Sequence, residues 1–279
     1  MEYVSRFEDL YEEGMPYLSI RTSLDEILKD LEYVQEKLSR GTCSRRSPLG
    51  SHVCWQSEGG QDFSSPSIQD ILVLHPPRII RALVNEKIIT GVSSFLPLVE
   101  AATKLALNIY SSDEYGQNLA SFRSALELEI PDLLHKTILQ VEDRLTSYAS
   151  SPSFSSQTAQ CLSEEFPEGD ILFLPLCNGG TMAGLDVFLR YQDLLRDKTV
   201  PYLYCGIRYS RLRCEDTGIT FCAGEEKLLS ELARDRTVVI FDEDVQSGTT
   251  LWRAEHFLRE SLGKNLLICS MANYTCPQR

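Results

Sequence analysis

Apolar residues recur at helical spacing through the first half of the chain. A Ser-Leu-Asp-Glu sequence at residues 23–26 has the form of a capping box, and aliphatic residues separated by charged ones continue from it to about residue 41. Similar stripes follow at residues 68–74, 77–84, 93–110, 121–126 and 131–148. Each stripe predicts an amphipathic helix that buries one face. We therefore expect residues 1–152 to form an all-helical N-terminal region.

Two stretches rich in serine, glycine and proline interrupt these stripes. Residues 41–67 contain few aliphatic side chains, which is typical of a mobile loop. Residues 150–156 read Ser-Ser-Pro-Ser-Phe-Ser-Ser and separate the helical stripes from a different pattern. We place the domain boundary there, between residues 1–152 and residues 153–279.

Short apolar runs replace the helical stripes after this boundary. Strand candidates lie at residues 171–177, 200–207, 237–241 and 266–271. Helix candidates lie between and after them, at residues 181–197, 225–234 and 249–262. Strands that are apolar on both faces and alternate with helices are typical of a parallel sheet covered on both sides. The expected fold class is α/β, a parallel-sheet domain preceded by the helical region.

The charge balance narrows the choice of partners. The 279 residues include 40 Asp and Glu against 27 Lys and Arg, which gives a formal net charge of −13. Such a field repels nucleic acid and anionic membranes, so we expect neither as a partner. The acidic N-terminus does not resemble a secretory signal, and no apolar run approaches the ~18 residues of a membrane-spanning helix. We expect a cytoplasmic protein.

Metal binding by cysteine is not indicated. The nine cysteines include no CxxC pair and the four histidines no HExxH spacing. A tetrahedral zinc site usually needs such a close pair. Cys205, Cys214 and Cys222 share one segment and could converge, but no spaced histidine accompanies them. We expect small, mostly buried, reduced thiols.

Candidate chemistry is concentrated at residues 238–250. A buried strand ends there in two adjacent carboxylates, Asp242 and Glu243, and a Ser-Gly-Thr-Thr turn follows at the start of a helix. Ligands of open α/β sheets bind at this edge. Hydroxyls, free amides and the positive end of a helix dipole suit a phosphate monoester, and carboxylates suit neighbouring hydroxyls. The pattern indicates a sugar-phosphate site.

This stretch resembles the signature of type I phosphoribosyltransferases that binds 5-phosphoribosyl-1-diphosphate (PRPP). Four apolar residues, two acids, small polar residues, glycine and two threonines match it, and the resemblance extends over about residues 155–279. It implies that Asp242 and Glu243 hold the ribose hydroxyls. It also implies a 5′-phosphate loop made of Gln246, Ser247, Gly248, Thr249 and Thr250.

Two positions depart from this signature. Asp244 stands where the family usually has an apolar residue, and Gln246 stands where purine-type members carry Asp. The second departure argues against purine-base chemistry.

An earlier turn matches the pyrophosphate loop of the same family. The strand at residues 171–177 runs into Asn178, Gly179 and Gly180 and then into a helix. Backbone amides at such a turn bind phosphate oxygens. Its place before the acidic motif agrees with the order in the family.

Three arginines lie between the two motifs, at the place of the family's flexible loop, which carries basic residues to the leaving pyrophosphate. They are Arg208, Arg211 and Arg213. Arginine suits bidentate contacts with phosphate. A solvated hairpin is an equal alternative for Arg211 and Arg213, whereas Arg208, nearest the strand end, is the stronger candidate.

The resemblance implies a PRPP-dependent phosphoribosyltransferase that transfers the 5-phosphoribosyl group to a nitrogen nucleophile and releases pyrophosphate. The implied catalytic residues are Asp242, Glu243, Arg208 and Arg211. The implied cofactor is Mg²⁺ carried by PRPP, without direct protein ligands. The acceptor is unidentified, and we expect the helical region to form the hood that covers it.

Two alternatives come from other classes. One is a non-catalytic regulatory protein that binds PRPP or a nucleotide, and the other is an interaction scaffold built on the helical half. The oligomeric state is open, with a homodimer among the options.

Overall fold

The computed structural model describes residue 3 and residues 20–41, 67–140, 151–177, 179–195, 201–209, 218–243, 248–263 and 268–272. The loop expected at residues 41–67 lies outside these ranges except for its two end residues.

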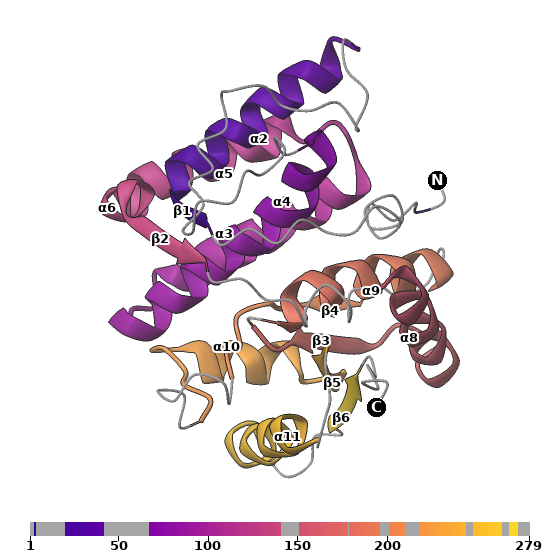
Figure 1. Cartoon of the computed structure of the whole chain (residues 1–279). Coiled ribbons are helices and arrows are strands. Elements are labelled where there is room, and N and C mark those ends of the chain that lie inside the picture. Colours follow the sequence, from indigo (N-terminus) through magenta and orange to yellow (C-terminus); the bar gives the residue numbers. More distant parts are fainter. Residues whose placement is uncertain are drawn as a thin grey trace, which may run out of the picture.

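Helices dominate the N-terminal half. They are α2 (Leu24–Ser39), α3 (Ile68–Thr90), α4 (Phe95–Ser111), α5 (Gly116–Glu129) and α6 (Pro131–His135) (Figure 1). The capping box of α2 is confirmed, because the Glu26 amide donates to Ser23 Oγ at 3.2 Å and the Ser23 amide donates to the Glu26 carboxylate at 2.8 Å. These two bonds fix the start of the helix at the residue that the sequence predicted.

A small antiparallel sheet corrects the expectation of an all-helical region. Strand β1 (Ile20–Ser23) pairs with β2 (Thr137–Gln140), so that Ile20 lies opposite Gln140 and Ser23 opposite Thr137. The helix predicted at residues 131–148 is therefore wrong over β2. The segment preceding α2 supplies the hydrogen-bonding partner that makes the extended conformation stable, and β-branched Thr137 and Ile138 favour it.

Helix α3 is one helix where the sequence predicted two. Pro76 and Pro77 lie inside it. A proline has no N–H for the carbonyl four residues earlier, which for Pro77 is the carbonyl of Val73. The Tyr110 hydroxyl donates to that carbonyl at 2.8 Å. A side chain from α4 thus replaces the missing hydrogen bond, and the helix continues through the proline pair.

The C-terminal half contains a four-stranded sheet in the order β4-β3-β5-β6, with all pairs parallel. Its strands are β3 (Ile171–Pro175), β4 (Tyr202–Leu203), β5 (Thr237–Asp242) and β6 (Ile268–Ala272). Its helices are α8 (Pro152–Glu165), α9 (Gly180–Leu195), α10 (Glu225–Leu232) and α11 (Thr249–Leu262). The expected α/β class with a parallel sheet is confirmed.

Helix α8 was not predicted. It begins inside the serine-rich stretch that the sequence analysis interpreted as a break. Pro152 is its first residue, where proline's missing N–H costs nothing and its fixed φ favours a helix. A proline that looked like a terminator is therefore a helix start.

Alternate residues of the central strands pack on opposite sides of the sheet, as strand geometry requires. One set packs on α9 and on α3 and α4 of the N-terminal half: Ile171, Phe173, Val239 and Phe241. The other set packs on α10 and α11: Leu172, Leu174, Val238 and Ile240. The sheet is thus buried on both faces.

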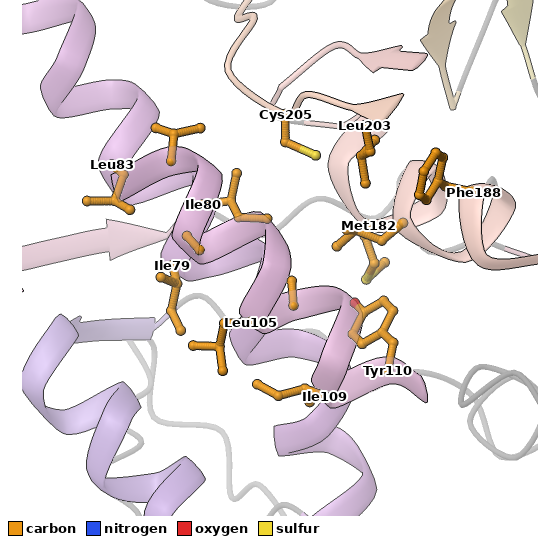
Figure 2. Close-up of a cluster of buried hydrophobic side chains, with 14 of the residues drawn as sticks. Ile79, Ile80, Leu83, Leu105, Ile109, Tyr110, Met182, Phe188, Leu203 and Cys205 are labelled. Atoms are coloured by element: carbon orange, nitrogen blue, oxygen red, sulfur yellow. The ribbon is translucent and has the colours of Figure 1, made fainter. Parts of the chain in front are cut away.

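One buried cluster joins the two halves of the chain. Figure 2 shows Ile79 and Leu105 from the N-terminal helices in the same cluster as Met182 and Phe188 of α9 and Leu203 of β4. Tyr110, which satisfies the proline-freed carbonyl, belongs to it as well. The boundary at residue 152 stays a prediction, but the hydrophobic core runs across it.

Candidate functional site

The order of the strands reverses between β3 and β5. From β3 the chain proceeds outward to β4 on one side, and from β5 it proceeds outward to β6 on the other. Ligands of open α/β sheets bind outside the carboxyl ends of the strands at such a point. The turn with Gly179 and Gly180 follows β3, and the acidic pair Asp242 and Glu243 ends β5. The two predicted motifs therefore lie on neighbouring strands at the expected edge.

The Glu243 carboxylate lies directly against the turn that follows β3. A Cβ atom placed on Gly179 would overlap both carboxylate oxygens, and one placed on Gly180 would lie 3.5 Å from Glu243 Oε2. Glu243 is buried, with 7% of its surface exposed. Only glycine at position 179 allows the carboxylate to sit where it does. The structure thus brings the acidic pair of one motif into contact with the glycine turn of the other.

This contact places a carboxylate at the start of α9, which begins at Gly180. The amides of a helix's first turn have no partner inside the helix and carry partial positive charge, so they favour an anion. In the structure that anion is the protein's own Glu243. A phosphate group could bind the same amides in two ways. It could displace the carboxylate, or it could lie beside the carboxylate with a cation between the two anions.

Arg208 lies at the same edge of the sheet. It forms a parallel bridge with Cys177, and the Cys177 amide donates to the carbonyl of Ile207 at 2.7 Å. Cys177 is the last described residue before the glycine turn. The Arg208 Nη1 donates to Asn85 Oδ1 of α3 at 2.8 Å. The predicted arginine is therefore held beside the strand that leads into the turn.

Helix α3 brings a second arginine to this place, which sequence reasoning did not single out. Burial raises the pKa of the Cys177 thiol, and the positive charges of Arg81 and Arg208 act in the opposite direction, so both lie within electrostatic reach of Cys177. Arg81 Nε is buried and has no hydrogen-bond partner among the residues that the structure describes. A signal for it exists in the sequence: Arg81 and Asn85 are four residues apart on α3 and share one face.

Lys87, near the end of the same helix, is neutralised inside the protein. It forms a salt bridge with Glu225, and both side chains are fully buried. Lys87 Nζ also donates to the carbonyl of Gly206 at 2.7 Å. The Glu225 carboxylate accepts two further hydrogen bonds, one from Tyr204 Oη at 2.6 Å and one from the Cys222 amide at 2.9 Å. Every charged atom of the pair has protein partners, so this cluster joins α3 to the C-terminal half and offers no charge to a ligand.

The second turn of the site begins α11. Gly248 precedes the helix with φ of 70°, a left-handed conformation that glycine adopts without strain, and Thr249 and Thr250 form the first residues of the helix. The helix bounds predicted here, residues 249–262, are confirmed. Four predicted site residues lie outside the described ranges: Asn178, Arg211, Gln246 and Ser247.

The acids of the site suit a magnesium ion that a ligand brings with it. Asp242 and Glu243 are adjacent oxygen donors, which Mg²⁺ prefers. No three His, Cys, Asp or Glu side chains gather into a metal site within the described ranges. Cys205 and Cys222 are free, buried thiols, and burial raises the pKa of Cys222 to about 11.

Comparisons with protein-family models, with curated proteins and with solved structures found no match for this chain. None of the helices in the described ranges combines the length and the apolar character needed to cross a membrane. The residues gathered at the strand-order reversal are therefore the basis for a functional assignment.

Proposed function

We propose that the protein binds PRPP at the reversal between β3 and β5 and transfers its phosphoribosyl group to a nitrogen nucleophile. The observation that carries this proposal is the contact of Glu243 with the Gly179–Gly180 turn. Two motifs that resemble the PRPP-binding parts of type I phosphoribosyltransferases are 63 to 64 positions apart in the sequence and touch in space. The finer fold assignment, a type I phosphoribosyltransferase-like domain with the helical region as its hood, belongs to the same proposal.

Each part of the site has a task in this reaction. Asp242 and Glu243 hold the ribose hydroxyls, the amides of Gly179 and Gly180 receive the diphosphate, and the turn before α11 receives the 5′-phosphate. The bond between ribose C1 and the diphosphate oxygen breaks while the bond from C1 to the acceptor nitrogen forms. Positive charge develops on the sugar and negative charge on the leaving diphosphate, so cations fixed beside the diphosphate lower the barrier. Arg208 is placed for that role.

The position of Glu243 predicts a strict requirement for a divalent cation. Glu243 and the diphosphate could lie close together if Mg²⁺, bound with the ligand, supplied positive charge between them. Without it, two anions would compete for the same amides. Removing the cation with EDTA is therefore expected to abolish measurable PRPP binding, rather than only to slow catalysis.

Calorimetric titration with PRPP and Mg²⁺ tests the proposal. The wild type should bind in the micromolar range, and D242N/E243Q should weaken binding at least ~10-fold, because both hydroxyl acceptors lose their charge. Gly179→Ala should weaken it as well, since the new Cβ displaces the Glu243 carboxylate. Gly218→Ala is the matched control, because nothing lies within 4 Å of a Cβ at that position.

Pyrophosphate release across a panel of bases and amines then separates two functions. Release with one acceptor supports the transferase. PRPP binding without release from any acceptor favours the second candidate, a non-catalytic regulatory protein, which the departures at Asp244 and Gln246 also favour. A folded wild type that binds no PRPP would refute both.

A further inference from the structure

We propose that Arg81 of α3 is a further ligand-binding residue, which together with Arg208 holds the diphosphate of the ligand and selects for a 1-diphosphate over a simple sugar phosphate. This inference rests on the proposed function and assigns the helical half a task that the sequence did not predict. From the sequence, those helices were expected to cover the acceptor. In this proposal a cation of α3 instead binds the diphosphate.

The position of α3 makes this possible. In Figure 1 the helix lies between the other N-terminal helices and the C-terminal half, and its side chains Ile79 and Leu83 pack in the core cluster shared by both halves. The amide of Ala223 donates to the carbonyl of Gly91, just beyond the helix, at 3.2 Å. Apolar contacts and a hydrogen bond therefore fix α3 against the C-terminal half, so that its side chains have defined places there.

A hydrogen bond ties Arg208 to the face of α3 that carries Arg81. Arg208 donates to Asn85, one helical turn after Arg81 on the same face of α3. The charges of both arginines act on Cys177, which leads into the glycine turn. A ligand with several negative charges would be attracted by both guanidinium groups.

The two other cations of α3 near Arg81 already have charged or polar partners in the protein. Lys87 also acts on Cys177, but its charge is balanced by the buried Glu225. Arg78, one turn before Arg81, donates to His75, which in turn contacts Asp30 of α2. Arg81 forms no such cluster within the described ranges, and its buried Nε has no hydrogen-bond partner there.

A diphosphate fits this arrangement better than a monophosphate does. Its two phosphoryl groups can accept from the turn amides at one end and from two arginine forks at the other, and each fork can form two parallel hydrogen bonds. The 5′-phosphate of the ligand is bound elsewhere in the proposed site, at the turn before α11. Affinity for a sugar phosphate without the 1-diphosphate should therefore not depend on Arg81.

Calorimetry with three probes tests this assignment: PRPP, inorganic pyrophosphate and ribose 5-phosphate, each with Mg²⁺. Arg81→Gln is expected to weaken the affinity for PRPP and for pyrophosphate about tenfold or more. The affinity for ribose 5-phosphate should stay within about twofold of the wild type. Arg81→Lys, which keeps the charge but loses the fork, should give an intermediate loss for the first two probes. Arg234→Gln is the matched control, because it removes the same charge at an exposed position.

The outcomes separate this inference from the proposed function. Pyrophosphate binding that depends on Arg81 supports the site even if PRPP does not bind, in which case the proposed function fails alone. An equal loss for all three probes, or unchanged affinities in Arg81→Gln while the wild type binds PRPP, would overturn the role of Arg81. A wild type that binds no pyrophosphate would overturn it as well.

Discussion

Lys87 and Arg81 lie fewer than two turns apart on one helix, yet their surroundings differ in burial and in hydrogen-bond partners. Lys87 is fully buried, and a carboxylate and a carbonyl contact its ammonium group. Arg81 is partly exposed, and its buried Nε has no hydrogen-bond partner among the described residues. Removing one member of a buried charge pair leaves the other without its partner and destabilises the fold, whereas a partly exposed charge outside such a pair can be removed at little cost to the fold.

Removing Lys87 should have the largest effect on stability. Lys87→Met leaves Glu225 buried without its cation, so the free energy of unfolding is expected to fall by about 3–5 kcal/mol. Urea denaturation followed by circular dichroism measures it. The double variant Lys87→Met/Glu225→Gln removes both charges and should recover much of the loss. A loss below about 1 kcal/mol in the single variant would contradict the structural role of the pair.

His75 gives an intermediate, pH-dependent effect. It is 1% exposed, its Nε2 lies 2.9 Å from Asp30 Oδ2, and its Nδ1 accepts from Arg78. Burial lowers the pKa of His75 below its ordinary 6.5. The unfolded chain then binds a proton below about pH 6.5 that the folded chain does not bind, so stability falls as the pH drops through that value, by at most ~1.4 kcal/mol per pH unit.

Unfolding free energies measured between about pH 5.5 and 7.5 test the sign of this effect. In His75→Gln the amide keeps a donor for Asp30 and an acceptor for Arg78 but does not titrate, so the slope attributable to His75 should disappear. A wild-type stability that rises on acidification over this range would show that His75 is protonated in the folded state instead.

Arg81→Gln should change stability least. Because Arg81 belongs to no closed cluster among the described residues, we expect a change within about 0.5 kcal/mol, similar to that of Arg234→Gln. Urea denaturation of both variants makes the comparison. If Arg81→Gln lowered the free energy of unfolding by about 2 kcal/mol or more, Arg81 would have a structural role like that of Lys87, which would argue against ligand binding.

Local signals in the sequence were enough for much of the fold. The capping box at Ser23, the apolar runs of β3 and β5 and the start of α11 after Gly248 depend on residues within a few positions of each other. The placement of Glu243 against Gly179 follows from parallel neighbouring strands whose carboxyl ends share one edge, which the alternating pattern predicted.

The remaining features depend on contacts between distant residues. The carbonyl of Val73, which Pro77 leaves without its helical partner, accepts from Tyr110, which lies 33 positions after Pro77 in the sequence. Strand β2 exists because Ile20 to Ser23 lie beside it. Sequence reasoning did not single out Arg81, because its proposed role depends on the packing of α3 against the C-terminal half.

The pairing of Lys87 with Glu225 also constrains the order of events while the protein is being made. The two residues are 138 positions apart. A ribosome adds about 5–20 residues per second, so roughly 7–28 s pass between the synthesis of the lysine and that of its carboxylate. Throughout that interval the ammonium group has to remain in water. The C-terminal end of α3 can therefore become buried only after most of the chain has been translated.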